Sequence, residues 1–292
     1  MKQIIIFLLL ASLISCNNTN EKADGYGNFE ATEVTISAEA NGKLEFLNLE
    51  EGDLLEPNTL VGLVDTTQLY FNKQQLVASK ATVYSKSENV LSQISVLQAQ
   101  LKTTFIEQKR IQNMFAENAA TKRQVDEIEG KVDVIKEQIK GVQTQNAPII
   151  NEIAPIDVQI KKINDQIKNS KIINPIKATV LAKYAEPNEI TSFGKPLYKI
   201  ANLSQMTLRV YISETQLPNV KLNQKVTVKI DNGTEMKSYP GTISWISSVA
   251  EFTPKIIQTK EERINLVYAV KVDAKNDGSL KIGMPAEMWV SP

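Results

Sequence analysis

The residues of this chain that could carry chemistry are few. None of its 292 residues is a histidine, which removes the usual general base at neutral pH, the serine–histidine and cysteine–histidine nucleophile pairs, and histidine metal sites. The single cysteine, Cys16, allows neither an internal disulfide nor a thiolate metal cluster. A pair of carboxylates or a serine–lysine dyad would still be possible in an enzyme, but we find no such residues that the sequence would bring together. The sequence therefore predicts a protein that is not an enzyme and has no metal and no cofactor.

Lipid attachment is the chemistry that Cys16 does suit. The N-terminal stretch "MKQIIIFLLLASLISC" places Lys2 before an apolar run from Ile4 to about Ile14, which is too short for a permanent membrane helix and is typical of an export signal. Its end, Leu13-Ile14-Ser15-Cys16, resembles the bacterial lipoprotein signal, in which cleavage leaves the cysteine as a lipid-bearing N-terminus. The alternative is an ordinary signal peptide with an incidental cysteine.

The overall composition excludes several classes of partner. Lysine plus arginine equals aspartate plus glutamate at 33 each, so no nucleic acid or acidic polymer is indicated as a ligand. Only 42% of the residues are apolar and 6% aromatic, which favours an elongated chain over one thick core. After Cys16 no run of about 18 apolar residues occurs, so we expect lipid to hold the mature chain at a membrane that it does not span.

Two stretches far apart in the chain share one pattern of short strands and turns. Residues 31–66 alternate apolar and polar positions between tight turns at Gly42 and at Gly52-Asp53. Residues 172–202 repeat this plan about 136 positions later. Because four short strands are too few to bury a core alone, we expect the two copies to close on one another into one small sandwich.

The residues between these two copies read as two long amphipathic helices. In the second, apolar positions alternate at spacings of three and four, which is the seam of a coiled coil; they are Val125, Ile128, Val132, Ile135, Ile139, Val142, Ile149, Ile153, Ile156, Ile160, Ile163 and Ile167, with Asn146 as the one polar member. Pro148 and Pro155 share one outward position, so they should bend this helix without shifting its phase.

The first helix, from about Thr66 to Phe115, contains no glycine or proline. Its seam consists of Leu69, Leu76, Val83, Val90, Ile94, Leu97, Leu101, Ile111 and Phe115, flanked by Tyr70, Val77, Tyr84, Leu91 and Phe105. Each arm has about 50 residues, which at 1.5 Å per residue is about 75 Å. Equal arms joined by a short turn predict an antiparallel hairpin, and two separate helices in a bundle are disfavoured because each apolar stripe is narrow.

The turn between the two arms and the residues just before it contain the second group of candidate functional residues. Thr121 has a glutamine three residues later, which is a capping box that would begin the second helix, and Asn118 suits a left-handed helix end. Arg110 and Met114 fall off the seam, one turn apart on the same outward face. The alternative to a functional role is a solvated arginine paired with Glu107 beside a stray methionine. An arginine fork and an adaptable apolar side chain also suit a partner's helix ends.

These patterns resemble a known family. The two repeated stretches resemble the half-motifs of a lipoyl-like domain, and Arg110, Met114 and Thr121 resemble the arginine–leucine–serine tip motif of efflux adaptors that meet TolC-type channels. Over residues 28–292 the chain is similar to HlyD-like membrane fusion proteins, the periplasmic adaptor subunits of tripartite efflux and secretion systems, in their lipoprotein form. Ala178 departs from the family's usual glycine, so its turn is in question if it needs positive φ.

The resemblance implies an α+β fold: a long antiparallel coiled-coil hairpin inserted in a split lipoyl-like β-sandwich and followed by a β-barrel domain. The expected parts are a lipoprotein signal peptide (1–15), a lipid-anchored flexible tether (16–27), a lipoyl-like half (28–66), the hairpin (67–171) with its tip near 116–121, the second lipoyl-like half (172–202) and the barrel (203–292). Gly42, Gly52 and Asp53 would form the lipoyl-like turns, and no lysine stands on a hairpin between the halves as a carrier domain would need.

The resemblance also implies a function. Such adaptors bridge an inner-membrane exporter, here one of the ATP-binding-cassette (ABC) type, to a TolC-like outer-membrane channel, and they assemble as homo-oligomeric rings, commonly of six. Cys16 would anchor the chain in the periplasm, at the inner membrane of a Gram-negative bacterium. The alternatives are a coiled-coil scaffold lipoprotein of the cell envelope without a transport role, and a lipoyl or biotin carrier. The sequence does not name the cargo.

Overall fold

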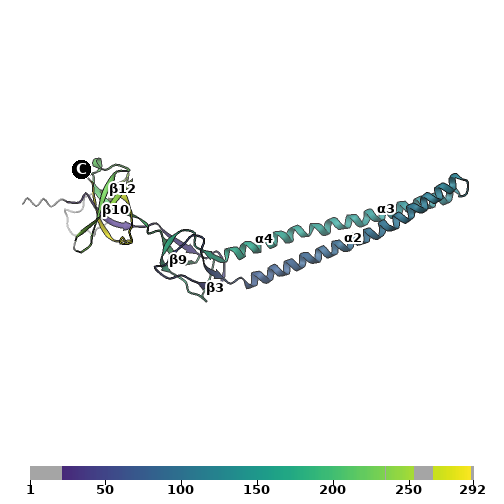
Figure 1. Ribbon diagram of the computed structural model, residues 1–292, viewed down its shortest axis with the longest axis horizontal. Coiled ribbons are helices and arrows are strands. Elements are labelled where there is room, and N and C mark those ends of the chain that lie inside the picture. The colour runs from purple at the N-terminus through teal and green to yellow at the C-terminus, as the bar shows by residue number, and fades with distance from the viewer. Residues whose placement is uncertain (1–21, 234, 253–265, 291–292) are drawn as a thin grey trace, which may run out of the picture.

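The chain is an elongated molecule of three parts in a row, described for residues 22–233, 235–252 and 266–290 by a computed structural model. Figure 1 shows a β-barrel at one end, a small β-sandwich in the middle and a helical hairpin at the other end. The predicted α+β fold, a hairpin inserted in a split lipoyl-like sandwich and followed by a barrel, is confirmed. The export signal and Cys16 lie outside the described residues.

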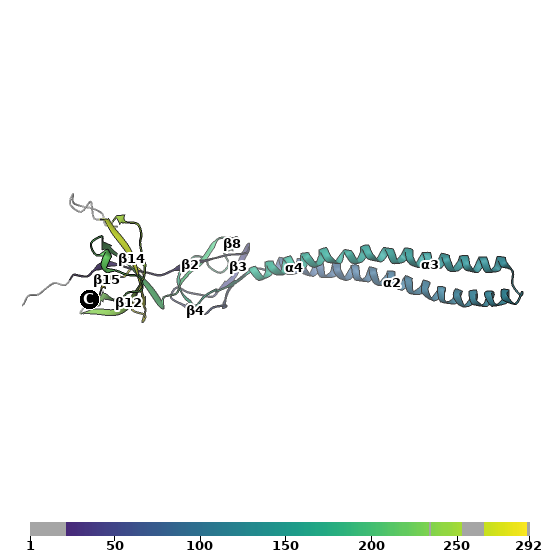
Figure 2. The ribbon, with the colours of Figure 1, turned by 90° about the horizontal axis from the view of Figure 1, so that it is seen from above.

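The hairpin consists of two antiparallel arms (Figures 1 and 2). The first arm is one helix of 50 residues, and the second is divided in two; these helices are α2 (Thr67–Ala116), α3 (Lys122–Asn151) and α4 (Ile153–Asn169). The predicted seam is present, because the buried side chains of α3 are Val125, Ile128, Val132, Ile135 and Ile139. The two arms therefore pair along an apolar stripe that repeats in phase with the coiled coil.

Polar pairs interrupt the seam toward the sandwich. The buried Ser87 hydroxyl donates to Asn146 Oδ1 at 2.8 Å, so the one polar member of the second arm's seam has a partner on the first arm. Nearer the sandwich, Lys80 Nζ lies 2.6 Å from Asp157 Oδ1, and this hydrogen bond raises the pKa of Lys80. None of the residues of α4, all of which are described, is buried. The arms are therefore closely packed toward the tip and more loosely packed near the sandwich.

Pro155 explains why the second arm is two helices. A proline has no N–H to donate to the carbonyl of Asn151 four residues earlier, and α3 ends at that residue. In α4, Pro155 stands in the first turn, where backbone N–H groups lack an intrahelical acceptor in any case. Pro148, in contrast, is accommodated inside α3. Where a bend was expected, the structure has a break between two helices at Glu152. The apolar seam positions continue with the same spacing on both sides of the break.

The sandwich takes four strands from each copy of the repeated pattern. The first half supplies β2 (Glu33–Ser37), β3 (Gly42–Leu47), β4 (Leu54–Leu55) and β5 (Leu60–Val64), and the second half supplies β6 (Lys171–Ile173), β7 (Ala178–Lys183), β8 (Ile190–Thr191) and β9 (Pro196–Ala201). The strand orders are β2-β9-β7-β4 and β6-β5-β3-β8. Since each sheet mixes strands of both halves, neither half has a core of its own, as expected.

The two halves are related by an internal two-fold repeat whose hydrogen bonds match. Gly52 N donates to Val180 O at 2.9 Å, and its counterpart Asn188 N donates to Leu44 O at 2.7 Å. Both donors have positive φ, 96° at Gly52 and 75° at Asn188. Asparagine tolerates this left-handed geometry better than most residues, which is why it can replace the glycine. The offset of 136 positions seen in the sequence is therefore also an equivalence of backbone geometry.

The substitution at Ala178 creates no strain. Gly42 has a φ of 152°, a value that favours glycine, whereas Ala178 is absent from the positive-φ residues of the described chain. The Ala178 side chain is instead buried in the sandwich core. The second copy therefore begins its β7 strand with ordinary backbone geometry, so the alanine fits.

The barrel is formed by strands from both ends of the described chain. Its C-terminal strands are β10 (Gln205–Ser213), β11 (Lys225–Asp231), β12 (Met236–Ile246), β13 (Glu251–Phe252), β14 (Leu266–Lys275) and β15 (Pro285–Trp289), with a short 3₁₀ turn at Leu217–Asn219. The sheet order is β10-β1-β15-β11-β12-β14-β13, where β1 is Gly25–Glu30, and the pairing of β10 with β14 closes the barrel.

The position of β1 corrects two expected boundaries. Residues 28–66 were expected to form the first lipoyl-like half, with a tether before them, but Gly25–Glu30 pairs with β10 and β15 in the barrel. The reason is close packing: a Cβ at Gly27 would lie 1.7 Å from the carbonyl oxygen of Arg209, and Phe29 is buried in the barrel core. The first lipoyl-like half therefore starts at Glu33, and the chain enters the barrel before it enters the sandwich.

Candidate functional site

The tip of the hairpin is a fixed turn, because backbone hydrogen bonds close the end of α2. Asn118 has a φ of 58°, the left-handed geometry that the sequence suggested. Its N–H donates to Phe115 O at 3.0 Å, and the Ala119 N–H donates to Met114 O at 2.7 Å. This pair of bonds is a Schellman motif, which satisfies carbonyls that would otherwise lack partners at a helix end.

The opposite side of the turn is closed by the predicted capping box. Thr121 is the N-cap of α3: its hydroxyl accepts from the Gln124 N–H at 3.4 Å, and the Gln124 side-chain oxygen accepts from the Thr121 N–H at 2.8 Å. The side chain of Thr121 is therefore already engaged within the chain. Between the two caps, residues 117–121 have little freedom to change shape, so the tip presents its side chains from a preformed turn.

Arg110 and Met114 project from the last turns of α2 and are exposed, as their positions off the seam predict. The Arg110 side chain is 69% exposed, and its Nη2 lies 2.6 Å from Glu107 Oε2. Met114 is 41% exposed. The ion pair to Glu107 is the one that a merely solvated arginine would make, but an exposed pair of this kind contributes little to stability. It holds one edge of the guanidinium and leaves the other donors facing solvent.

Phe115 belongs to this surface although its spacing placed it in the seam. The structure leaves its side chain 42% exposed, one residue before α2 ends at Ala116. It is a further exposed apolar side chain in the last turn of α2, next to Met114 in the sequence. The sequence does hold a signal for the exposure of Phe115, because its heptad position falls in the last turn of the helix. We refer to Arg110, Met114 and Phe115 together as the tip surface.

The other site residues suggested by the sequence lie far from the tip surface. Gly42, Gly52 and Asp53 are in the sandwich, at the opposite end of the hairpin (Figure 1). The Asp53 carboxylate accepts from the Glu50 N–H at 2.8 Å, and the Asp53 carbonyl accepts from the Val180 N–H at 2.9 Å. The first bond fixes the turn within the first half, and the second ties the first half of the sandwich to the second. The three residues therefore fix the turn geometry and form no part of a binding site at the tip.

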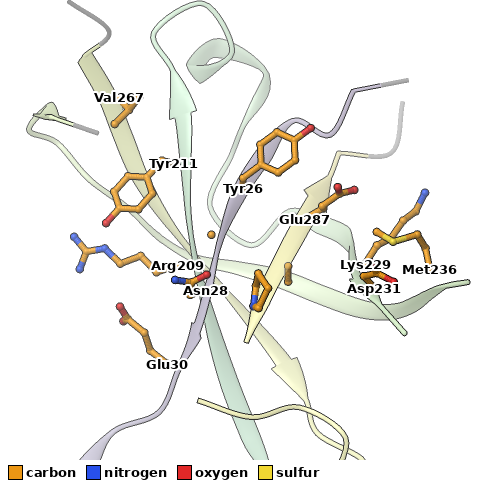
Figure 3. Close-up of a pocket in the computed structure, with 13 residues that line it drawn as sticks. Tyr26, Asn28, Glu30, Arg209, Tyr211, Lys229, Asp231, Met236, Val267 and Glu287 are labelled. Carbon is orange, nitrogen blue, oxygen red and sulfur yellow. The ribbon is translucent and has the colours of Figure 1, made fainter. Parts of the chain in front are cut away.

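The barrel carries an open groove on its outer face, with a volume of about 880 Å³. Figure 3 shows Tyr26 and Tyr211 above it, with Arg209 and Glu30 on one side and Lys229 and Glu287 on the other. Both cations are occupied: Arg209 Nη2 makes two 2.9 Å hydrogen bonds to Glu251, and Lys229 Nζ lies 3.9 Å from the centre of the Trp289 ring. Both cations that line the groove are therefore held by partners within the chain.

Among residues 22–233, 235–252 and 266–290, no helix has the length and apolar character needed to cross a bilayer. The same residues contain no cluster of three or more acidic, histidine or cysteine side chains suited to a metal ion.

Barrel, sandwich and hairpin in this arrangement form the membrane fusion protein fold, which solved structures share. The structure of the membrane fusion protein Spr0693 from Streptococcus pneumoniae matches with a TM-score of 0.56 at 15% identity, covering 91% of this chain and 97% of that one. MacA from Actinobacillus actinomycetemcomitans matches with a TM-score of 0.54 at 19% identity, covering 90% and 76%.

The sequence places the chain more narrowly. It is 30% identical over 293 residues to a UPF0194 membrane protein of Yersinia enterocolitica, covering 91% of this chain and 89% of that protein. A UPF0194 membrane protein of Acidithiobacillus ferridurans is 26% identical over 294 residues, covering 91% and 86%. The chain therefore belongs to the UPF0194 membrane protein family. No protein-family model matches it.

Proposed function

We propose that this protein is a non-enzymatic, HlyD-like periplasmic adaptor that bridges an inner-membrane exporter, of the ABC type, to a TolC-like outer-membrane channel for efflux or secretion. The observation that carries the proposal is the tip surface, which stands on a preformed turn at the far end of a rigid hairpin. The hairpin places this turn about 75 Å from the sandwich, taking 1.5 Å per residue for the 50 residues of α2. Such a spacer suits contact between two partners that are far apart.

The chemistry of the tip surface suits the ends of a partner's helices. The exposed Arg110 guanidinium can donate to carbonyl groups, which lack partners at the C-terminal end of a helix. Met114 and Phe115 beside it offer an adaptable apolar contact and an aromatic ring for a groove between two such helices. Because the turn is already ordered by its two caps, docking costs little conformational entropy. A helical channel mouth is the partner that fits this combination.

The test compares tip variants with matched variants elsewhere on the hairpin. Arg110→Ala and Met114→Asp should leave unfolding free energy within about 0.5 kcal/mol of the parent, since both side chains are exposed. They should lower cross-linking to the outer-membrane channel and export about tenfold, the effect of losing roughly 1.4 kcal/mol of binding energy. Readouts are melting temperature, site-specific cross-linking to the channel in cells and export of a reporter substrate.

Each variant has a control on α3 with the same local chemistry. Lys140→Ala removes an exposed cation whose Nζ lies 3.8 Å from Glu137, as Arg110→Ala removes one paired with Glu107. Val134→Asp places a charge at an exposed apolar position, as Met114→Asp does. Both controls should export and cross-link like the parent. If the tip variants cannot be told apart from these controls, the tip surface is a solvated helix end and the docking proposal is wrong.

A scaffold lipoprotein of the cell envelope without a transport role is the second candidate, and the long coiled coil alone would suit it. It predicts that deletion of the gene leaves export and sensitivity to drugs and detergents unchanged. The adaptor proposal predicts the reverse. An adjacent gene pair for an ATPase and a permease would favour the adaptor and its ABC-type exporter.

A further inference from the structure

The β-barrel has two ends, and one of them carries the point where the described chain begins. β1 starts at Gly25 and β15 finishes at Trp289 on the same end, since Gly25 pairs with Met288 in antiparallel register. The opposite end joins the sandwich through the short connections from β1 to β2 and from β9 to β10. Figure 1 shows the barrel at the end of the molecule opposite the hairpin tip. We refer to the end of the barrel that carries Asp24, away from the sandwich, as the free end.

Four large apolar side chains are exposed at or near the free end. Leu222 is 58% exposed and Val249 is 69% exposed, in the connections that leave β10 and β12. Leu266, the first residue of β14, is 48% exposed, and Trp245 near the end of β12 is 41% exposed. Because β10 and β12 end and β14 begins where β1 begins, these side chains all lie toward one end of the barrel. Several exposed apolar side chains on one surface indicate a contact site.

The turns that present Leu222 and Val249 are held by hydrogen bonds. Asn223, directly after Leu222, has a φ of 64°, and its N–H donates to the Ile243 carbonyl at 2.8 Å. The Ser247 hydroxyl donates to the Val249 carbonyl at 2.7 Å. The two apolar side chains are therefore exposed on turns whose shape is already set. Apolar groups on a fixed turn lose little conformational freedom when they are covered.

The polar groups beside these side chains suit a membrane interface. Trp245 joins an apolar ring to one N–H donor, and such rings are enriched at the level of the lipid headgroups. Lys221 and Lys225, on either side of Leu222 in the sequence, are exposed, and lysine can lay its apolar stem along lipid while its ammonium reaches the phosphates. Glu214 balances Lys221 in the connection from β10 to β11, so the contact depends on the apolar groups more than on charge.

The reach of the N-terminal chain identifies the surface that these side chains meet. Asp24 is fixed to the free end, because its N–H donates to the Met288 carbonyl at 3.0 Å and its carboxylate accepts from the Val290 N–H at 2.7 Å. Eight residues, Asn17 to Asp24, follow Cys16 up to this point. At about 3.6 Å per residue they span at most about 29 Å. A lipid on Cys16, which the sequence predicts, would therefore hold the free end close to a bilayer.

We propose that the free end of the barrel docks on the lipid bilayer, with Leu222, Val249 and Leu266 inserted among the headgroups and Trp245 at their level. The partner is lipid, contacted by protein side chains in addition to the acyl chains on Cys16. The depth expected for such an interfacial contact is about 5 to 10 Å. Because the free end lies opposite the tip, the contact points the hairpin away from the membrane (Figure 1). The proposal rests on the predicted lipid anchor and adds the orientation that the proposed bridging function needs.

Fluorescent labels at single cysteines test the contact. The full-length lipoprotein is reconstituted without an exporter in vesicles of phosphatidylethanolamine and phosphatidylglycerol, with or without a nitroxide on the lipid headgroup. Lipidation blocks Cys16, so a label at Leu222→Cys or Val249→Cys reports on one position. Met236→Cys, an exposed apolar position where β12 begins at the other end of the barrel, is the control. The nitroxide should quench the first two labels about fivefold more than the control, because those labels enter the interface.

Three results would overturn the proposal. Equal quenching at Leu222→Cys, Val249→Cys and Met236→Cys would show that the free end does not enter the bilayer. Quenching that appears only after an exporter is added to the vesicles would show that a protein, and not lipid, is the partner of the free end. Failure of the protein to float with the vesicles would remove the short tether on which the proposal rests. Inert tip variants together with strong quenching at Leu222→Cys would instead overturn only channel docking.

Charged variants then separate insertion of the apolar side chains from proximity to the bilayer. With the label at Val249→Cys, the pair Leu222→Asp and Leu266→Asp should lower quenching about threefold, since a carboxylate enters an apolar environment at high cost. The control pair Ile190→Asp and Met236→Asp places two charges at exposed apolar positions elsewhere and should leave quenching unchanged. Urea titrations should give parent-like unfolding for both pairs, as expected for exposed sites. Equal quenching in the two pairs would contradict the proposal.

Discussion

The most unusual single residue is Tyr198, whose side chain is fully buried in the sandwich core. Its hydroxyl has no hydrogen-bond partner within the described part of the chain. A buried polar group without a partner costs about 1 to 3 kcal/mol, and phenylalanine has the same shape without that group. Tyr198→Phe should therefore raise the free energy of unfolding by about 1 kcal/mol or more in urea titrations. A destabilised variant would show that the hydroxyl does have a partner.

The same residue predicts a response to alkaline pH. Burial raises the pKa of Tyr198 to about 12 from an ordinary value of 10.0. Tyr198 ionises less readily in the folded state than in the unfolded state. The stability that its neutral form contributes is therefore complete below pH 10 and is lost as the pH rises toward 12, at about 1.4 kcal/mol per pH unit. Other tyrosines and lysines titrate in this range, so the measurement is the difference between parent and Tyr198→Phe. Parallel stability curves from pH 9 to 11.5 would contradict it.

At the scale of elements, the caps of the tip determine how firmly α3 begins. Thr121→Ala removes the hydroxyl half of the capping box and should cost about 1 kcal/mol, whereas Thr121→Ser keeps it. Hydrogen exchange at the Gln124 amide should accelerate roughly fivefold in the alanine variant and stay near parent in the serine variant. Equal exchange in all three proteins would mean that the turn is held by its backbone bonds alone.

The polar pair in the hairpin seam predicts energetic coupling between the arms. Ser87→Ala leaves Asn146 Oδ1 without its donor and should cost about 1 kcal/mol. Asn146→Val leaves the serine hydroxyl without its acceptor, but the double variant replaces both groups with apolar contact. Its destabilisation should fall short of the sum of the single effects by roughly 0.5 to 2 kcal/mol. Additive effects in a double-mutant cycle, as expected for the exposed Lys140–Glu137 pair, would show that the two residues do not interact.

The sequence predicted those elements whose apolar residues recur at a regular spacing. The seam of the second arm was readable because thirteen positions keep one period, and all of them are buried or half-buried. The break at Glu152 is a local effect of Pro155 on one carbonyl, so the seam carried no sign of it. Arg110 and Met114 were identifiable as off-seam residues, whereas the exposure of Phe115 depends on where the turn lies. Periodicity predicts the interior of a helix better than its end.

At the scale of the whole molecule, the attachment to a membrane that we predict rests on Cys16, which lies outside the described residues. We predict that Cys16→Ser releases the mature protein into the soluble periplasmic fraction, because a lipid on Cys16 is the attachment that the sequence offers. Fractionation of cells after a high-salt wash measures this, with a Ser15→Ala variant as a control that keeps the cysteine. Sedimentation of Cys16→Ser with the membranes would contradict the lipid anchor.

The arrangement of the three parts was predictable, but the assignment of β1 was not. "GYGNFE" is short, contains two glycines and follows a polar stretch, so its first three residues read as the end of a tether and its last three as the start of the first lipoyl-like half. Its partners are β10 and β15, and Gly25 pairs with Met288 more than 260 positions away. A pairing over that distance leaves no periodic trace near the strand itself. The sandwich and the hairpin are inserted between β1 and its partner strands, just as the hairpin is inserted between the two halves of the sandwich. Paired strands are therefore far apart in the sequence.

That nesting sets an order for folding as the chain is exported from its N-terminus. The hairpin pairs neighbouring segments, so its arms can meet as soon as α3 emerges, whereas the sandwich needs β6 to β9 and the barrel needs β15 beside β1. Contacts between distant segments form slowly, since a long loop must first be closed. With export from the N-terminus, which the signal-like start of the sequence predicts, β1 emerges first among the described strands and waits for β15, the last of them. The sandwich can close once β9 has emerged, whereas the barrel closes only after β15.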